Sequence, residues 1–263
     1  RLITCDISGY GESPDVADKK AYDLLVQAES GLVGISGSPN ELGRIGVSMV
    51  DAGTGMTAYY GVLEAIIQRG ITGKGSGVRV SLFDVAADWM TVPLTQHDFG
   101  AGGPTRVGLK HPTIAPYGAF ETSDGSLTLI SIQNEREWVR LCDQALGSPE
   151  MATDARFDSN ANRVANRDAL ESDMNRIIGA LDQSTFQSGL ADASIAYGNV
   201  SSLADLSSHP ALRRRTVHTS TGQTVELPAH PVRWTELPGM VDRPGGRVPT
   251  IGEHTDTIRS EFV

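Results

Sequence analysis

The sequence predicts an α/β protein, in which part of a parallel α/β large domain is followed by a small α+β domain. Two apolar runs, residues 2–8 and 78–82, read as strands, and the chain between them carries helical periodicity and Gly-rich turns. Strands that alternate with helices in this way form parallel sheets. From about residue 112, a hairpin followed by helical patterns indicates the second domain.

The elements of the first part follow in order. The strand 2–8 leads into a glycine turn, and a helix is expected over 20–35 with Leu24, Leu25, Ala28 and Leu32 turned inward. A second helix covers 51–69, because its large apolar residues recur at spacings of three and four. These are Met56, Tyr59, Tyr60, Leu63, Ile66 and Ile67. The segment 70–77 lacks Walker A spacing, so it is a turn into the strand 78–82.

A helix is expected over 84–95, and the segment 100–104 terminates it. The elements of the second part follow. Strands on both sides of the turn 123–125 form a hairpin, since Ser-Asp-Gly is a typical hairpin connection. Helical faces come next, the longer one over 162–181. Their apolar residues are Trp138, Leu141, Cys142, Leu146, Leu170, Met174, Ile177 and Ile178.

The composition restricts the class of protein. Of the 263 residues 39% are hydrophobic and 21% charged, which is ordinary for a globular protein. The formal net charge of −10 argues against nucleic acid as a partner, and no apolar stretch approaches the roughly 18 residues that span a bilayer. Cys5 and Cys142 lie far apart, and the spacing of the histidines (His97, His209, His218, His230 and His254) predicts no metal site. We therefore expect a cytoplasmic protein without metal, membrane or nucleic acid.

Asp51 is the candidate catalytic residue. It stands where the apolar run 47–50 meets small residues that open a helix. Negative charge is favoured at that end of a helix, and glycines at 53 and 55 have no Cβ to keep backbone N–H groups from a ligand oxygen. A carboxylate beside such donors is the arrangement of a nucleophile that forms an acyl intermediate. The alternative is that Asp51 only caps the helix.

Short segments spread over nearly the whole chain carry a family resemblance through their order and spacing. They are residues 7–11, 18–28, 30–32, 51–55, 72–75, 78–84 and 249–255. In these segments the chain resembles the family III CoA-transferases, the CaiB/BaiF group. The resemblance implies a partial Rossmann-like parallel α/β large domain and a small α+β domain.

The resemblance also implies the chemistry and the domain limits. Asp51 takes the place of the family's nucleophile, and Lys20, Ala21, Tyr22 and Asp23 match residues that contact coenzyme A, which is bound as an acyl-CoA substrate. Because the net charge is negative, CoA needs a local basic patch, for which Lys19, Lys20 and Arg44 are candidates; the alternative is that the two lysines form a solvated helix start. The expected divisions are a large CoA-binding domain over 1–95, a linker over 96–112, a small domain over 113–205, a proline-containing return linker over 206–248, and a closing segment over 249–263 that packs on the large domain.

The segment 106–118 resembles the subgroup that handles small dicarboxylates such as itaconate, mesaconate, citramalate and succinate. Arg106, Lys110 and His111 would pair there with a distal carboxylate, with succinyl-CoA as donor. Glu135 is a fourth candidate substrate residue. The chain lacks the glycine run of the formyl-CoA:oxalate enzymes at this place. The alternative is that these three residues belong to an exposed linker.

Two further functions are weighed against CoA transfer. An α-methylacyl-CoA racemase shares the fold, but it needs a His where Tyr22 stands and a Glu that Glu135 matches best. A tyrosine is a poor base at neutral pH, because its phenol loses a proton only near pH 10. The last possibility is an inactive fragment that serves as an assembly module. The presence of both Asp51 and Tyr22 argues against it.

The position of the strands predicts that sequence is missing. A parallel sheet should not begin with one strand at residue 2 and the next at 78, and family members carry a sizeable portion before the equivalent of Arg1. We expect a truncated or cleaved part of a longer protein, whose active site is completed by the missing N-terminal segment. That segment is a possible partner as a separate fragment, and an interlocked homodimer is expected from the family.

Overall fold

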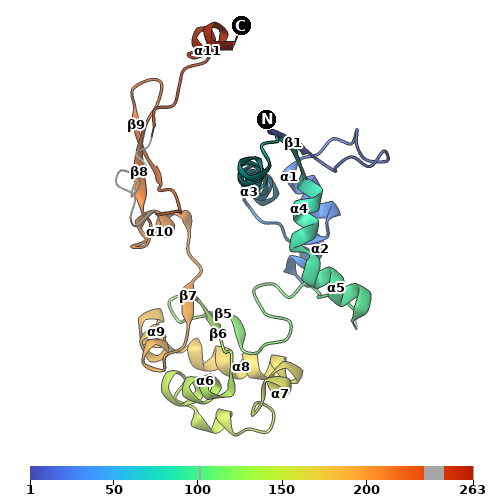
Figure 1. The fold of residues 1–263 in the computed structure, drawn as a ribbon. Coiled ribbons are helices and arrows are strands. Elements are labelled where there is room, and N and C mark those ends of the chain that lie inside the picture. Colours follow the sequence, from blue (N-terminus) through green and yellow to red (C-terminus); the bar gives the residue numbers. More distant parts are fainter. Residues whose placement is uncertain (101, 234–245, 263) are drawn as a thin grey trace. The chain divides into compact units, whose positions relative to one another are not determined.

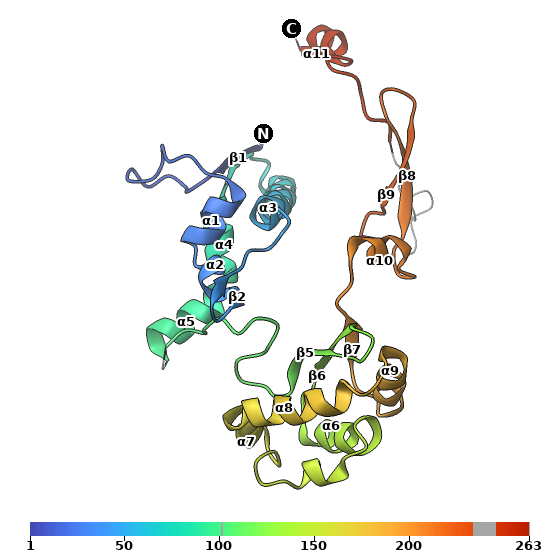
Figure 2. The same ribbon diagram turned by 180° about the vertical axis from the view of Figure 1, so that it is seen from behind.

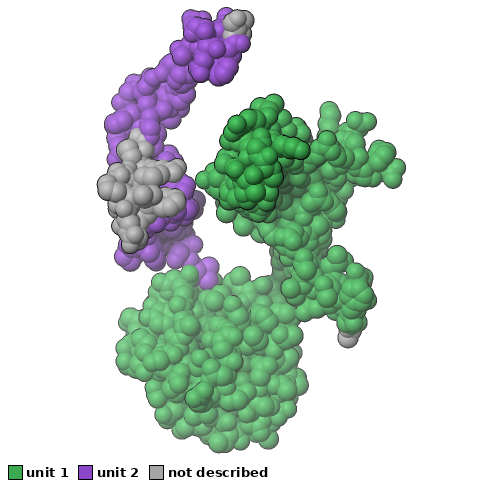
Figure 3. All heavy atoms as spheres, viewed as in Figure 1, with its two compact units in different colours: residues 1–199 green, residues 200–263 purple. Residues whose placement is uncertain are grey.

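The computed structural model describes residues 1–100, 102–233 and 246–262. The chain divides into two compact units, residues 1–199 and 200–263 (Figure 3). Unit 1 holds two separate hydrophobic clusters, one within residues 10–86 and the other within residues 115–195. The domain limits predicted from the sequence, including the packing of the closing segment on the large domain, stay predictions.

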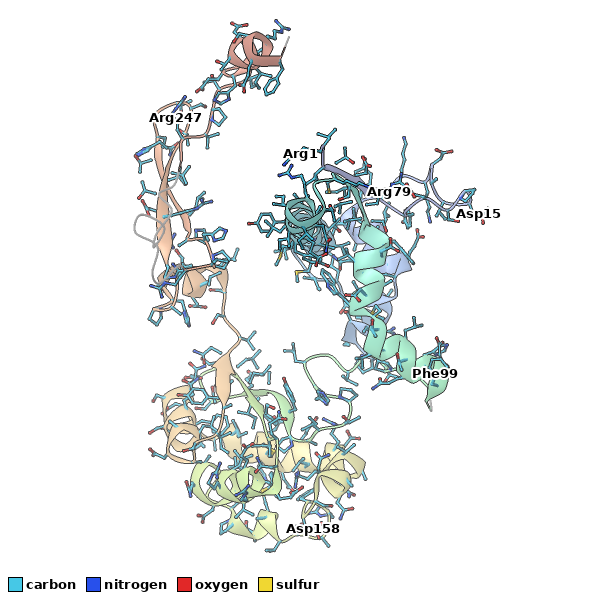
Figure 4. All side chains as sticks on the ribbon, in the orientation of Figure 1. Arg1, Asp15, Arg79, Phe99, Asp158 and Arg247 are labelled. Atoms are coloured by element: carbon cyan, nitrogen blue, oxygen red, sulfur yellow. The ribbon has the colours of Figure 1, made fainter. Side chains whose placement is uncertain are left out.

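The first part of unit 1 contains the predicted parallel pair. β1 (Thr4–Ser8) runs parallel to β4 (Gly77–Ser81), with Thr4 opposite Gly77 and Ser8 opposite Ser81. The connection between these strands passes through α1 (Asp23–Glu29), α2 (Leu32–Ile35), the short antiparallel pair β2 (Gly37–Ser38) and β3 (Glu41–Leu42), and α3 (Met49–Thr72) (Figure 1). The α/β prediction is therefore confirmed. The loop before α1 extends outward with Asp15 at its tip, and Arg79 on β4 forms an ion pair with Glu12 of that loop (Figure 4).

The helix predicted over 84–95 is two helices, α4 (Leu82–Trp89) and α5 (Thr91–Phe99). Pro93 explains the break. A proline has no N–H to donate to the carbonyl four residues earlier, here that of Trp89, and it is tolerated in the first turn of a helix. The chain therefore ends one helix at Trp89 and starts the next with Pro93 in its first turn.

The inward face predicted for α1 is wrong. Leu24, Leu25 and Ala28 are exposed, whereas Asp23, Val26 and Gln27 are buried. The helix starts at Asp23 instead of Lys20, and its buried face lies against α3 and α4. Two polar side chains are tolerated on that face because hydrogen bonds satisfy both.

α3 confirms the helix predicted over 51–69 and packs mainly through small residues. Its buried side is made of Val50, Gly53, Thr54, Ala58 and Ala65. The large apolar residues that revealed the helix in the sequence lie on its exposed side. They are Met56, Tyr59, Tyr60, Leu63, Ile66 and Ile67.

The second part of unit 1 is the predicted α+β block. β5 (Tyr117–Glu121), β6 (Leu127–Ser131) and β7 (Tyr197–Asn199) form an antiparallel sheet in the order β5-β6-β7. The helices are α6 (Glu135–Arg140) with a π-helical turn Leu141–Ala145, a 3-10 turn Pro149–Ala152, α7 (Asn160–Ala165), α8 (Arg167–Ile178) and α9 (Gln183–Asp192). α8 lies against β5 and α9 against β6 (Figure 2). The hairpin prediction is confirmed.

The core of this block contains the apolar residues that the sequence predicted for its helices. Trp138, Leu141, Leu170 and Met174 are all buried in one cluster with Phe120 of β5 and residues of β6 and α9. The helix predicted over 162–181 is interrupted at Asn166, so α7 and α8 are separate. Both still turn their apolar faces to the same core.

Unit 2 contains more regular structure than the extended return segment predicted over 206–248. α10 (Leu203–Ser208) begins with a capping box made by Ser202 and Asp205. β8 (Arg214–His218) then pairs with β9 (Thr224–Pro228) in an antiparallel hairpin, and α11 (Thr255–Phe262) follows. Pro238 and Pro244, two of the prolines behind that prediction, lie outside the described residues.

Across the described ranges, none of the helices combines the length and the apolar character that crossing a membrane requires.

Candidate active site

Two segments that the sequence singled out meet at the start of α3. Asp23, the last residue of the predicted CoA-contacting group, accepts hydrogen bonds through Oδ1 from the backbone N–H of Val50 at 2.8 Å and of Asp51 at 3.3 Å. The group 20–23 and Asp51 therefore lie at one place, although 28 residues separate Asp23 from Asp51.

Asp51 is the third residue of α3 and not its N-cap. The N-cap position belongs to Ser48, whose side chain makes no capping hydrogen bond within the part of the chain that the structure describes. Asp23 takes that role from α1, and the Ala52 N–H is bonded to the Ser48 carbonyl at 3.0 Å. The interpretation of Asp51 as a simple cap is therefore wrong.

The Asp51 side chain is exposed in the first turn of α3. Among residues 1–100, 102–233 and 246–262, no protein group forms a hydrogen bond or an ion pair with its carboxylate. The carboxylate lies at the end of a helix that stabilises negative charge. Within the described residues, no protein partner has to be displaced from this carboxylate before a substrate carbonyl meets it.

Gly53, the first glycine after Asp51, does not have the role predicted for it. Gly53 lies inside α3, and a Cβ on it would stand 2.3 Å from Cζ2 of the Trp89 ring. Thr54 is buried, and its hydroxyl donates to the Val50 carbonyl at 2.7 Å. The prediction that Gly53 opens a backbone N–H group to a ligand is therefore corrected: its missing Cβ makes room for an indole. For Gly55 it stays a prediction.

The predicted CoA-contacting residues differ in accessibility. Tyr22 is 72% exposed and precedes α1 in extended conformation, and Lys20 is exposed beside it. Ala21 packs against Gly9, where a Cβ would stand 2.3 Å from the Ala21 methyl group. Lys20 and Tyr22 are thus accessible to a ligand, and contact with CoA stays a prediction for all four residues.

The predicted basic patch is only partly available. Lys19 forms an ion pair with Glu29, and its ammonium group lies 4.5 Å from the centroid of the Tyr10 ring. The Glu29 partner raises the pKa of Lys19, so the pair holds the charge on this lysine. Lys20 and Arg44 are exposed, and they are the cations of the patch that remain open to phosphate groups.

Arg106 holds a loop in the structure. Its guanidinium donates to three backbone carbonyls, those of Ser38 at 3.1 Å, Gly34 at 3.2 Å and Pro39 at 3.2 Å. The linker is thereby fastened to the segment that contains β2. Pairing of Arg106 with a substrate carboxylate stays a prediction, and it requires these contacts to be exchanged.

Lys110 and His111 also have protein partners. Lys110 forms an ion pair with Glu171 of α8. The His111 ring stacks on Tyr117 with centroids 5.3 Å apart, and its Nδ1 accepts the Thr113 N–H at 3.2 Å. Their predicted contact with a distal carboxylate is not tested by these interactions.

Glu135 is engaged in the small α+β block. It accepts hydrogen bonds from Arg163, at 2.6 Å and 3.2 Å, and from the Asn160 N–H at 2.9 Å. Arg163 is 1% exposed and lies over the Trp138 ring. Hydrogen bonding to Arg163 lowers the pKa of Glu135. A carboxylate held in this way is a weak base, which disfavours the proton transfer that a racemase would require of it.

Metal-ligating groups and cysteine thiols are the other side chains to compare with Asp51 in the described residues. Within the described ranges, no three side chains of His, Cys, Asp or Glu gather into a group that could hold a metal ion. Burial raises the pKa of Cys142 to about 12, so its thiol is not a nucleophile at neutral pH. Among the groups predicted from the sequence, the candidate nucleophile with the best access remains Asp51.

Comparisons with known proteins identify the family of the chain. The sequence model of CoA-transferase family III matches residues 1–255. The chain is 31% identical to the acetyl-CoA:oxalate CoA-transferase of Acetobacter aceti, over all of this chain and 67% of that protein. It is 29% identical to the succinyl-CoA:glutarate CoA-transferase of Mus musculus, over all of this chain and 60% of that protein. It is 27% identical to the succinyl-CoA:mesaconate CoA-transferase of Haloarcula hispanica, over 99% of this chain and 66% of that protein.

Solved structures show the same fold. A CaiB/BaiF family protein from Brucella suis superposes with a TM-score of 0.80 at 28% identity, over 99% of this chain and 68% of that one. A Mycobacterium tuberculosis protein also gives 0.80, at 22% identity, which shows the fold alone. The chain spans 60–67% of the length of the three curated relatives described above.

Proposed function

This chain belongs to CoA-transferase family III, and from that premise we propose that its protein moves CoA from an acyl-CoA to a small carboxylic acid, with Asp51 as the nucleophile. One observation carries the proposal: the Asp51 carboxylate is exposed in the first turn of α3, while the backbone beneath it is hydrogen-bonded to Asp23. The side chain is thus open to a substrate although its backbone is held.

The proposed reaction proceeds by covalent catalysis. A carboxylate oxygen of Asp51 attacks the thioester carbonyl, and the carbon–sulfur bond breaks. CoA thiolate departs, and a mixed anhydride between Asp51 and the donor acid is formed. The thiolate attacks the Asp51 carbonyl of that anhydride, which releases the donor acid and forms an aspartyl-CoA thioester. The acceptor carboxylate attacks this thioester and expels CoA thiolate, which leaves Asp51 and the acceptor joined in a second anhydride. The thiolate then attacks the acceptor carbonyl of this anhydride, which yields the new acyl-CoA and frees the Asp51 carboxylate.

The acceptor we propose is a small dicarboxylate such as itaconate, mesaconate or citramalate, with succinyl-CoA as donor. Support comes from the segment 106–118 and from the names of relatives that act on mesaconate and D-citramalate. Oxalate and glutarate in the names of other relatives are dicarboxylates as well. Arg106, Lys110 and His111 are proposed to face the distal carboxylate after exchanging their protein partners. A cytoplasmic location and an interlocked homodimer are parts of this proposal.

The α-methylacyl-CoA racemase is the second candidate. It would need a base on each face of the substrate's α-carbon, and the residues available are Tyr22 and Glu135. Glu135 accepts two hydrogen bonds from the buried Arg163, which ties it to the core of the small α+β block. This engagement favours transfer over racemisation.

One experiment separates the two reactions. The protein as encoded in its organism is incubated in D₂O with succinyl-CoA and a panel of acids comprising itaconate, mesaconate, citramalate, glutarate and oxalate, and in parallel with a 2-methylacyl-CoA. We expect CoA exchange with at least one acid and no deuterium at the α-carbon of the 2-methylacyl-CoA, with Asp51→Asn as the inactive control. Deuterium at that carbon without CoA exchange would establish the racemase instead.

A further inference from the structure

We propose that Asp23 and Gln27 are positioning residues for Asp51. Together they form a buried hydrogen-bonded bracket, which we call the Asp23–Gln27 bracket, between α1 and the backbone that leads into α3. Its effect on catalysis rests on the function proposed above, whereas its effect on the backbone does not. The resemblance assigned Asp23 to CoA contact, and the bracket gives it a different role.

The bracket consists of four hydrogen bonds. Asp23 Oδ1 accepts the N–H groups of Val50 and Asp51, and Asp23 Oδ2 accepts the Gln27 Nε2–H at 2.6 Å. Gln27 Oε1 in turn accepts the Ile45 N–H at 3.2 Å. Both side chains belong to α1, and the backbone groups they hold lie in the loop before α3 and in its first turn.

Burial makes these bonds costly to lose. Asp23 is 8% exposed and Gln27 is 1% exposed. A buried polar group without a partner costs free energy, and more so when it is charged. The two residues are four apart on one helix, which places their side chains next to each other. Each side chain thus has a fixed part: Asp23 accepts, and Gln27 donates to Asp23 and accepts from Ile45.

The bracket supplies what α3 itself lacks. The first N–H groups of a helix have no partner within the helix, and a side chain at the N-cap usually accepts one of them. Ser48 does not do so within the described part of the chain. One of the N–H groups held instead by Asp23 belongs to Asp51, so the nucleophile's own peptide is fixed.

The bracket also fixes Asp51 relative to the proposed CoA contacts. Tyr22 directly precedes Asp23 in the chain, so the contact between Asp23 and Asp51 joins the two parts of the site. Covalent catalysis requires the attacking oxygen close to the carbonyl carbon, and a displacement of about 1 Å can lower the rate roughly 100-fold. We infer that the bracket sets this distance.

The test exchanges the polarity of the bracket. In Asp23→Asn, one oxygen still accepts the two N–H groups, but the new amide faces the Gln27 amide, donor against donor. Rotation of Gln27 only moves this conflict to the Ile45 N–H. In the double variant Asp23→Asn/Gln27→Glu, the new amide donates to the new carboxylate, whose second oxygen accepts the Ile45 N–H. All four hydrogen bonds and the total charge are restored.

We expect Asp23→Asn to lower kcat for CoA transfer about 10- to 100-fold with little change in KM for the acyl-CoA, and the double variant to recover most of kcat. The matched control is Asp182→Asn, which alters the cap of α9, where Asp182 accepts the Thr185 N–H at 2.8 Å. It should keep the parent kcat. Unchanged kcat in Asp23→Asn would overturn the proposal, and so would a double variant that folds without recovering activity.

A second readout does not depend on the reaction. Amide hydrogen exchange at Val50 and Asp51 should accelerate in Asp23→Asn, because the donor conflict with Gln27 weakens the hold of side chain 23 on both N–H groups, and it should return to the parent rate in the double variant. If the parent protein transfers no CoA, the proposed function fails, and this exchange pattern alone supports the bracket or, if protection is unchanged, overturns it. If the single variant does not fold, a double variant that folds and is active supports the bracket, and one that remains unfolded overturns it.

Discussion

Gly53→Ala tests how α3 is seated beneath Asp51. A Cβ at this position would stand 2.3 Å from Cζ2 and 2.5 Å from Cη2 of the Trp89 ring, and 3.4 Å from Cγ1 of Val85. Carbon atoms pack best at about 3.5–4.0 Å, so either the ring or the helix must move. The substitution therefore adds a methyl group where α3 meets α4.

The magnitude follows from two opposing effects. Alanine is favoured over glycine inside a helix by about 1 kcal/mol, whereas overpacking costs about 1–3 kcal/mol. Gly70→Ala isolates the first effect, because Gly70 lies in the same helix and a Cβ there meets no described atom within 4 Å. We predict that Gly53→Ala is less stable than Gly70→Ala by about 2 kcal/mol, which is about 4–8 °C in Tm.

Urea unfolding and thermal melts of both variants measure this difference directly. Because Gly53 lies two residues after Asp51, we also expect kcat for CoA transfer to fall in Gly53→Ala and to remain unchanged in Gly70→Ala. A Gly53→Ala protein as stable as Gly70→Ala would show that the Trp89 ring does not pack on α3 at this position. The proposed seating of the nucleophile would then be refuted.

Two predictions concern the small α+β block. The Thr122 hydroxyl and the Gln183 N–H lower the pKa of Asp124 from 3.8 to about 2, so this carboxylate stabilises the fold above pH 3.8 and the contribution is lost as the pH falls toward 2. Asp124→Asn should flatten the decline of unfolding free energy over that interval in urea titrations, and an unchanged decline would contradict the assignment. Glu135→Gln should destabilise the protein by about 1–2 kcal/mol in urea unfolding, because the buried Arg163 loses its charged partner. The loss is smaller than the roughly 3–5 kcal/mol expected for a fully buried pair, because the Glu135 side chain is 52% exposed and solvent screens the interaction. Deuterium exchange at a substrate α-carbon that vanished in this variant would support the racemase.

Helices and strands could be predicted where turn residues in the sequence mark their ends. The strand 78–82 follows a glycine-containing turn, and the hairpin surrounds Ser-Asp-Gly, so both appear in the structure as β4 and as β5 with β6. The helix 51–69 was evident from periodicity. Periodicity shows that a helix forms, but it does not show which side another element covers. In α3 the side with the large apolar residues is exposed and the side with the small residues is buried, which periodicity alone does not indicate.

The environment of the site could not be predicted in the same way, because its contacts are distant in the sequence. Asp23 and Gln27 are buried, and their side chains accept hydrogen bonds from backbone groups 18 to 28 residues away in the sequence. Gly53 is shaped by Trp89, and Arg106 by carbonyls about 70 residues before it. The partners of Asp23, Gln27 and Arg106 are backbone atoms, so the residue types in the sequence do not identify them. The partner of Gly53 is a side chain, but it lies 36 residues later in the sequence. The sequence identified Asp51 as the nucleophile candidate, and the structure shows what holds it.

The most direct test of the account is to trap the covalent intermediate on Asp51. The protein as encoded in its organism is incubated with succinyl-CoA and then with hydroxylamine, and its peptides are analysed by mass spectrometry, with Asp51→Asn as control. Hydroxylamine attacks the Asp51 carbonyl of the mixed anhydride or of the aspartyl-CoA thioester and leaves a hydroxamate on Asp51, with the donor acid or CoA thiolate as the leaving group. The account therefore predicts that modification on Asp51 and its absence in the control. A hydroxamate on a different carboxylate, with Asp51 unmodified, would contradict it.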